Sequence, residues 1–400
     1  MISRLRSLDS QLLMFLFGLI CYGVSMGLFE SSFNNFLSDT YHMDALTRGH
    51  LEFPRELPGF LVAAVAGALF YFSEIRVAAI ALFLMALGQI GIAFFGTHYQ
   101  LMIGTMILWS IGMHLQMPVT RAIGLTLARE GGGAMLGKLG GLQTGAAIIG
   151  SGLLLLGLGN TEWAYTPVFL LAAVASLIGG IFYLSMRPVE GQTGERPKFI
   201  FRKRYSLFYL LNVLFGARKQ VFITFGPWVL IKVFGEPLST IALLNMIAAV
   251  GSMFLSPYIG KLIDRIGERP VLMADAVLMV GVCLGYGFAD QLGLGTFAVD
   301  LICVSFVMDQ MLFNAGIARA TYLKKIAVKP EDVTATLSLG VTVDHAVSMS
   351  IPTLGGMVWM LFGYQYVFMG AAGIALLNLL ATSFIRTPPR VVKEEALAAG

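Results

Sequence analysis

A group of charged residues stands directly before an apolar stretch near the start of the chain. Residues 50–60 read HLEFPRELPGF, and the following run, LVAAVAGALF, carries no charge. Glu52, Arg55 and Glu56 are spaced i, i+3 and i+4, so a helix would place them on one face. Such a group could bind a charged solute, exchange protons or pair internally. We interpret Arg55 and Glu56 as cavity or outer-gate residues, with an interfacial helix cap as the alternative.

Other ionisable side chains fall within long apolar runs. They are Glu30, Arg121, Arg218, Lys219, Asp300, Asp309 and Asp344. A charge at the bilayer centre costs at least ~2.5 kcal/mol, so such residues usually face a water-filled cavity or a partner. Glu30, Arg121 and Asp300 lie nearest the ends of their runs, and an interfacial position is an equal alternative for them.

Two adjacent cations and two histidines extend this candidate site. Arg218 and Lys219 would point about 100° apart on a helix. We expect one of them to pair with a buried aspartate, Asp309 or Asp344, and the other to bind a ligand. His114 and His345 could gain a proton near neutral pH. A histidine beside a carboxylate predicts a proton relay, with a hydrogen-bonded core histidine as the commoner alternative. The proton-coupling candidates are Asp309, Asp344 and His345.

The composition indicates where these residues must sit. Of 400 residues, 57% are hydrophobic and 12% are charged, whereas soluble domains have about 25% charged residues. Apolar runs of this length indicate membrane-spanning helices. The net charge is +4, but the basic residues lie in short blocks between apolar runs, so no nucleic-acid partner is expected. Cys21, Cys283 and Cys303 are far apart in apolar stretches, and their spacing predicts neither disulfides nor a metal site. No metal or other cofactor is expected.

Apolar runs between polar breaks predict twelve helices. The first six lie near 10–35, 48–72, 76–96, 100–127, 136–158 and 163–185, and the second six near 206–233, 237–259, 270–289, 294–318, 333–358 and 364–385. We therefore divide the chain into a six-helix half (1–185), a linker (186–204), a second six-helix half (205–386) and a tail (387–400).

The loop charges predict the orientation. Most of the 27 Lys and Arg residues fall in one alternate set of loops, which includes the linker and both termini. The other set holds only Arg48 and Lys232. By the positive-inside rule, the termini, the linker and the tail are cytoplasmic.

A loop motif after the eighth predicted helix resembles a known signature. GKLIDRIGERP matches G-x-L-x-D-R-x-G-x-R at Gly260, Leu262, Asp264, Arg265, Gly267 and Arg269. This pattern resembles the loop signature of the major facilitator superfamily, between the second and third helices of each half. We expect small Gly260 to let helices approach and Asp264 to cap a helix N-terminus. The basic residues would then bind helix C-termini and latch one conformation.

The first half carries a degraded copy of this motif, GALFYFSEIR. Gly67, Leu69 and Arg76 keep their places, but Tyr71 and Phe72 replace the Asp-Arg pair. A latch in the first half is therefore in doubt.

The resemblance implies an all-α integral membrane fold with twelve helices in two pseudo-symmetric halves. Helices 1, 4, 7 and 10 would line a central cavity, with 2, 5, 8 and 11 beside them. The candidate cavity residues are Glu30, Asn34, Glu52, Arg55, Glu56, His114, Arg121, Gln143, Arg218, Lys219, Asp309, Asp344 and His345. Asp275, in the outer helix 9, is an exception that we expect to pair with basic residues of the nearby loop.

These features predict a secondary transporter of the inner membrane that works by alternating access and is not an enzyme. Its partners would be a small polar or charged solute, protons and the lipid bilayer, and the protein would be a monomer. The cations favour a solute with an anionic group, and the acidic residues leave room for a zwitterion. ATP drive within the chain is not expected because G-x-x-x-x-G-K-[ST] is missing.

Three alternatives remain. The first is a multidrug efflux pump, because Gly145, Gly150 and Gly152 faintly resemble the helix-five motif of drug–proton antiporters, although its proline is missing. A transporter-like receptor or scaffold without turnover is the second. The third, an intramembrane enzyme, would need a cluster such as H-E-x-x-H or G-x-S-x-G, and neither is present.

Overall fold

The computed structural model describes residues 10–68, 73–127, 132–158, 165–187, 202–293, 295 and 297–386. The helices of the first half are α2 (Ser10–Tyr41), α3 (Ala45–His50), α4 (Glu52–Ala68), α5 (Glu74–Phe95), α6 (Tyr99–Leu127), α7 (Gly132–Leu153) with the π-helical turn η2 (Leu154–Leu158), and α8 (Tyr165–Leu184). Residues 69–72, where the degraded motif loses its Asp-Arg pair, lie outside the described residues.

The second half begins with the 3-10 turn η3 (Lys203–Tyr205). Its helices are α9 (Ser206–Lys232), α10 (Leu238–Ile266), α11 (Glu268–Phe288), α12 (Phe297–Leu312) with η4 (Phe313–Ala315) and α13 (Gly316–Ile326), α14 (Pro330–Phe362), and α15 (Tyr364–Ser383). Within the described residues these helices make twelve segments, with α3 counted with α4, and α12 with η4 and α13. The predicted all-α fold of two six-helix halves is confirmed.

Most of these segments suit a bilayer. Nine of the described helical segments are long and apolar enough to cross a membrane. The segments α4, α6 and α9 are not in that set, and they carry polar residues such as Glu52, His114 and Arg218. Several candidate site residues therefore lie on the helices that are shorter or less apolar.

Local signals fix several helix boundaries. The side chain of Asp44 accepts a hydrogen bond from the backbone N–H of Thr47 at 2.7 Å and so caps α3. This bond lowers the pKa of Asp44. Gly267 ends α10 and precedes α11 with φ +89°, a conformation that L side chains rarely adopt.

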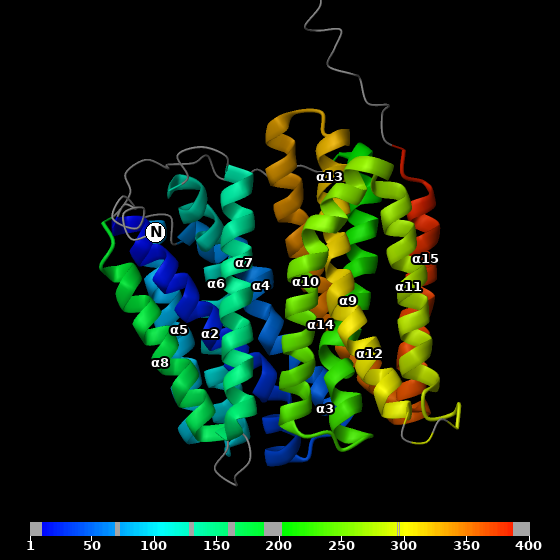
Figure 1. Cartoon of the computed structure of the whole chain (residues 1–400), viewed down its shortest axis with the longest axis horizontal. Helices are drawn as coiled ribbons and strands as arrows, with labels where there is room; N and C mark the ends of the chain where they lie inside the picture. Colours follow the sequence, from blue (N-terminus) through cyan, green and yellow to red (C-terminus); the bar gives the residue numbers. More distant parts are fainter. Residues whose placement is uncertain are drawn as a thin grey trace, which may run out of the picture.

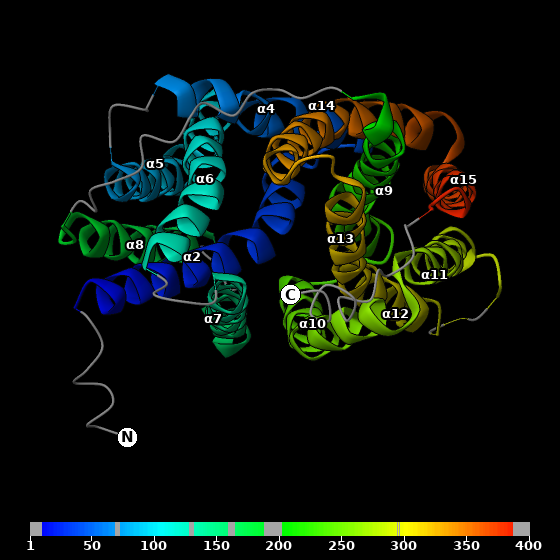
Figure 2. The same ribbon diagram turned by 90° about the horizontal axis from the view of Figure 1, so that it is seen from above.

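The halves lie side by side, with the start of α2 and the end of α15 at the same end of the bundle (Figure 1). We call this the terminal end, and the other the opposite end. In the first half α2 packs on α7 and α8, and α5 packs on α6 and α8. The halves meet closely where α3 and α4 pack against α14 (Figure 2).

Close backbone contact joins the halves at the opposite end. A Cβ atom on Gly49 of α3 would lie 2.3 Å from the carbonyl oxygen of Pro352 on α14. This separation is too short for a non-bonded contact between carbon and oxygen. Only glycine therefore allows the two backbones to approach this closely. Hydrogen bonds also join the halves elsewhere, from Asn245 to Ser31 at 3.1 Å and from Lys232 to the carbonyl oxygen of Ser38 at 3.4 Å.

Candidate functional site

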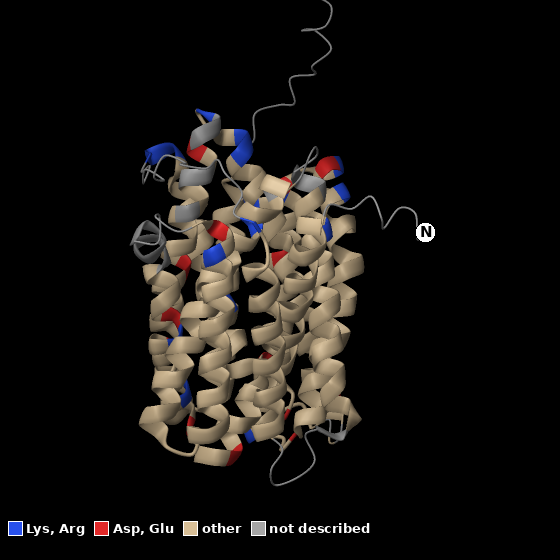
Figure 3. Ribbon diagram, turned by 90° about the vertical axis from the view of Figure 1, so that its left-hand side faces the viewer, with Lys and Arg blue, Asp and Glu red and all other residues tan. Residues whose placement is uncertain are grey.

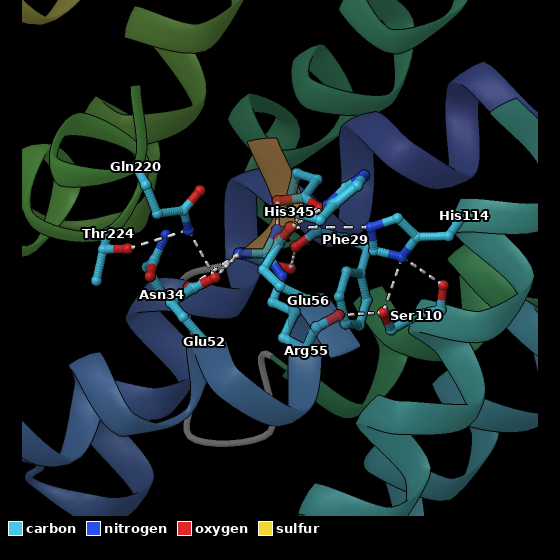
Figure 4. Close-up of polar contacts among 12 residues, drawn as sticks. Phe29, Asn34, Glu52, Arg55, Glu56, Ser110, His114, Gln220, Thr224 and His345 are labelled. Atoms are coloured by element: carbon cyan, nitrogen blue, oxygen red, sulfur yellow. Dashed lines mark hydrogen bonds and ion pairs between the residues drawn. The ribbon is translucent and has the colours of Figure 1, made fainter. Parts of the chain in front are cut away.

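A cluster of buried charges lies between the halves near the start of α4. Its centre is the fully buried Glu52. This carboxylate accepts hydrogen bonds from Arg48 at 2.6 Å and from Arg55 at 3.1 Å. Gln220 on α9 donates a third, at 2.9 Å, from the other half of the protein (Figure 4). The charges before the apolar stretch are therefore buried within the bundle, which favours the cavity or gate interpretation of Arg55 and Glu56 over an interfacial cap.

The two arginines extend this cluster. Arg48 donates to the side-chain oxygen of Asn34 at 3.0 Å. Arg55 donates a hydrogen bond to Glu30 at 3.0 Å. The Glu30 carboxylate is therefore paired within the protein. Two arginines and two glutamates thus neutralise one another. We call these four residues, together with Asn34 and Gln220, the inter-half cluster.

Arg48 was predicted to lie in an outer loop, which is wrong, because it lies in α3. Only 1% of this residue is exposed, and its guanidinium lies 5.9 Å from the centre of the Trp228 ring. Its spacing of i, i+4 from Glu52 was the signal that could have found it.

A second group joins α4, α6 and α14. The Nδ1 atom of His345 lies 2.8 Å from a carboxylate oxygen of Glu56, and the Nε2 atom of His114 lies 3.9 Å from the same oxygen. The histidine rings meet edge to face with centroids 4.9 Å apart. The sequence singled out all three residues but paired His345 with its neighbour Asp344. Figure 4 shows Glu56 between the two imidazoles.

The third group of charges lies within the second half. Lys219 forms an ion pair with Asp344, one of the two partners considered for it. Arg218 is buried, and its nearest carboxylate is Asp275 at 3.8 Å. Asp275 was expected to pair with loop residues, which is wrong because its side chain is buried toward α9.

Several polar atoms of this third group lack partners. The guanidinium nitrogens of Arg218 have no hydrogen-bond partner among the described residues, nor does one carboxylate oxygen of Asp309. Because Lys219 pairs with an aspartate, Arg218 is the cation that the prediction leaves for a ligand, and that role stays a prediction. Arg319, which sequence reasoning missed, packs its guanidinium 3.4 Å from the centre of the Phe215 ring.

A cavity of about 240 Å³ lies between α2, α6 and α7. Its polar lining comes from Tyr22, Thr120, Arg121 and Gln143. Two predicted cavity residues, Arg121 and Gln143, thus meet at one site. Arg121 is exposed and forms no ion pair with any residue that the structure describes.

Comparison with known sequences decides the family. The sequence profile of the Major Facilitator Superfamily matches residues 15–324 and 208–399. The chain belongs to this superfamily. It is a secondary transporter, not an enzyme, and a multi-pass integral membrane protein. No curated protein sequence matches it significantly.

Solved structures of this superfamily share the fold at low sequence identity. A variant of the nucleoside transporter NupG is 15% identical, with a TM-score of 0.78 over 94% of this chain and 100% of that one. The D-xylose–proton symporter is 14% identical, with a TM-score of 0.70 over 95% and 98%. A bacterial homologue of the human lysosomal transporter Spinster, inward-facing and occupied, is 13% identical, with a TM-score of 0.71 over 94% and 96%.

The superfamily's loop signature lies between α10 and α11 at the terminal end. Asp264, Arg265 and Arg269 are exposed and have no ion-pair partner among the described residues. The latch that they were expected to form therefore stays a prediction. Two details were predicted wrongly: Asp264 does not cap α11, whose N-cap is Gly267, and a Cβ on Gly260 would meet nothing within 4 Å.

Proposed function

We propose that this protein moves a small polar solute carrying an anionic group, either an anion or a zwitterion, by alternating access and in exchange for or together with protons. The observation that carries the proposal is Arg121, an unpaired cation in a cavity that also offers Tyr22, Thr120 and Gln143 as hydrogen-bonding groups. An arginine fork suits a carboxylate, which it can bind through two parallel hydrogen bonds. One structural neighbour is a POT family transporter in complex with 5-aminolevulinic acid, a zwitterion.

In this proposal the structure represents the state closed at the opposite end and open toward the terminal end. Glu52, Arg55 and Gln220 form the closed gate between the halves. Lys and Arg residues gather at the terminal end, with a few charges inside the bundle (Figure 3). By the positive-inside rule this end is cytoplasmic, and the membrane is the inner one. The linker (186–204) and the tail (387–400) then lie in the cytoplasm. A reporter fused to the C-terminus and active only in the periplasm should stay inactive.

Proton coupling is assigned to Asp309. It is 2% exposed, and one of its oxygens has no hydrogen-bond partner among the described residues. Buried carboxylates inside membrane helices are typical of proton pathways in transporters, so a proton can bind here and leave when the surroundings change. Arg218, Asp275 and Arg319 nearby would transmit that change to α9, α11 and α13.

Transport into proteoliposomes tests this function. A panel of 5-aminolevulinic acid, a simple monocarboxylate, a nucleoside and D-xylose separates charged from neutral solutes. We expect uptake of a charged member to follow an imposed proton gradient and to stop when a protonophore is added. Arg121→Gln should weaken it at least tenfold, whereas Lys138→Gln, which removes an exposed cation of α7, should not.

Two further outcomes are informative. Asp309→Asn should abolish gradient-driven accumulation while leaving exchange of solute across the membrane. Accumulation that survives Asp309→Asn would place coupling elsewhere. Binding of solute without any uptake would favour the receptor alternative. Uptake of apolar cations that is unchanged by Arg121→Gln would favour an efflux pump.

A further inference from the structure

Three side chains with metal-binding chemistry converge between the halves of the protein. They are Glu56 on α4, His114 on α6 and His345 on α14, and one donor atom from each lies within 4.8 Å of the others. We propose that these residues form a binding site for a divalent transition-metal ion such as Zn²⁺, which would join the two halves at this level of the bundle. The sequence could not show this site, because its ligands are spread over three helices instead of one local motif.

The distances between the three donor atoms are close to those of a zinc site, so binding would need only a small inward movement of the side chains. Zn²⁺ bonds nitrogen and carboxylate oxygen at about 2.0–2.2 Å, so ligand atoms around it lie roughly 3.3–3.6 Å apart. One Glu56 oxygen is 2.8 Å from His345 Nδ1 and 3.9 Å from His114 Nε2. These two separations bracket the required value, and the third, between the histidine nitrogens, is no more than 4.8 Å.

The hydrogen bonds of His114 already orient it as a metal ligand. Its Nδ1 atom lies 2.9 Å from the backbone carbonyl oxygen of Ser110. A carbonyl oxygen can only accept, so Nδ1 carries the proton and the Nε2 lone pair points toward Glu56. Metal-binding histidines are usually held in this way, through a second hydrogen bond that fixes the ring. At His345, Nδ1 would bind the metal in place of its hydrogen bond with Glu56, and the proton of that bond would pass to the other ring nitrogen or be released to solvent.

The local sequence of α4 leaves room for both rings. Gly59 follows Glu56 by one turn, and a Cβ atom at this position would lie 2.5 Å from Nε2 of His114 and 2.6 Å from Cε1 of His345. Any larger residue would push the imidazoles away from Glu56. Glycine is unfavourable inside a helix. Its presence at position 59 is therefore explained by the space that the two imidazole rings need.

The ligand set predicts which ions bind. Two imidazoles and one carboxylate suit Zn²⁺, Co²⁺ and similar first-row ions, with one position open to water. Mg²⁺ and Ca²⁺ prefer oxygen ligands and should not compete. Because α14 belongs to the second half and α4 and α6 to the first, a bound ion would hold the halves together near the inter-half cluster.

Zn²⁺ binding to the full-length protein, purified with a histidine-free tag, tests the site. We expect calorimetry to find one saturable site, unaffected by Mg²⁺ or Ca²⁺. Each of Glu56→Gln, His114→Ala and His345→Ala should weaken it at least tenfold. The other three histidines, His42, His50 and His98, are exposed, so their triple alanine variant is the matched control and should bind normally. Loss of binding in the control, or equal binding without both His114 and His345, would overturn the proposal.

Two measurements remain decisive if a ligand variant folds poorly. Co²⁺ added to the unaltered protein should give the strong visible absorption of a four-coordinate ion, and a weak octahedral spectrum would contradict the site. Gly59→Ala, which removes no ligand, should lower Zn²⁺ affinity. Zn²⁺ should also slow amide exchange in both α4 and α14 of the unaltered protein. Slowing confined to one half would overturn the bridging role.

Discussion

The two ends of the bundle differ in whether their charges bond across the two halves. At the opposite end, Glu52 is fully buried and bonded to cations on α3 and α4 and to Gln220 on α9. At the terminal end, Asp264 and Arg269 of the signature loop are exposed and have no ion-pair partner within the described residues. One end is thus joined by buried charges that bond across the halves, whereas at the other end the ion pairs Glu268–Lys325 and Asp332–Arg202 stay within the second half.

This difference shows what holds the present conformation. Burying ions is costly unless each is paired and hydrogen-bonded, so such a network favours one arrangement more than it adds stability. In the inter-half cluster most polar atoms have partners, and the Nε atom of Arg55 is an exception. Separation of the halves at this end would have to return these charges to water. We expect that exchange to be the principal barrier between the two access states.

Glu52→Gln should have the largest effect. It leaves the buried cations Arg48 and Arg55 with one carboxylate fewer, and breaking a buried pair costs about 3–5 kcal/mol. We expect a lower midpoint of thermal unfolding and faster labelling of cysteines introduced at the opposite end. Asp290→Asn, an exposed loop carboxylate at the same end, is the control and should change neither. An unchanged midpoint for Glu52→Gln would show that the cluster does not hold this end closed.

Gly49→Ala should have the next effect. Its Cβ would lie 2.3 Å from the carbonyl oxygen of Pro352, which is backbone and cannot rotate away. Overpacking of this kind costs typically ~1–3 kcal/mol, and α3 must move from α14 to relieve it. We expect increased labelling at the opposite end. The control is Gly104→Ala on α6, where a Cβ meets nothing within 4 Å.

The sequence predicted the helices well but the partners poorly, for physical reasons. Apolar length marks most of the membrane helices, so the segments were found to within several residues, although α13 extends the tenth to Ile326. Charges in apolar runs marked Glu52, Arg55 and Asp309. Partners depend on which helices cross, and one sequence gives no distances. Arg48 was therefore left in a loop and Glu56 was not joined to His345.

Acid should weaken the contacts of Asp332 at the terminal end. Asp332 lies ahead of the apolar part of α14 and accepts a hydrogen bond from Tyr205 at 2.6 Å, with Arg202 at 3.0 Å. The hydrogen bond, helped by Arg202, lowers the pKa of Asp332. A lowered folded-state value stabilises the protein above the unfolded pKa of about 3.9, and this contribution disappears as the pH falls through the folded value.

Unfolding midpoints measured from pH 6 down to pH 3 test this expectation. Asp332→Asn should be less stable than the unaltered protein at pH 6, and the difference should shrink toward pH 3. Cysteine labelling at the opposite end should not change, because these contacts join η3 and the start of α14 within one half. A difference that grows on acidification would reverse the sign of the proposed shift.

Asp264→Asn should have the smallest effect on stability and still impair transport. Substitutions of exposed side chains without partners usually change unfolding free energy by less than about 0.5 kcal/mol, and Asp264 is such a residue in this conformation. If the signature loop forms its latch only when the terminal end closes, the variant loses stability in that state alone. We expect a normal unfolding midpoint, slower uptake into proteoliposomes and a population shifted toward the conformation described here. Normal uptake would remove the latch, whereas a markedly lower midpoint would mean that Asp264 is already engaged.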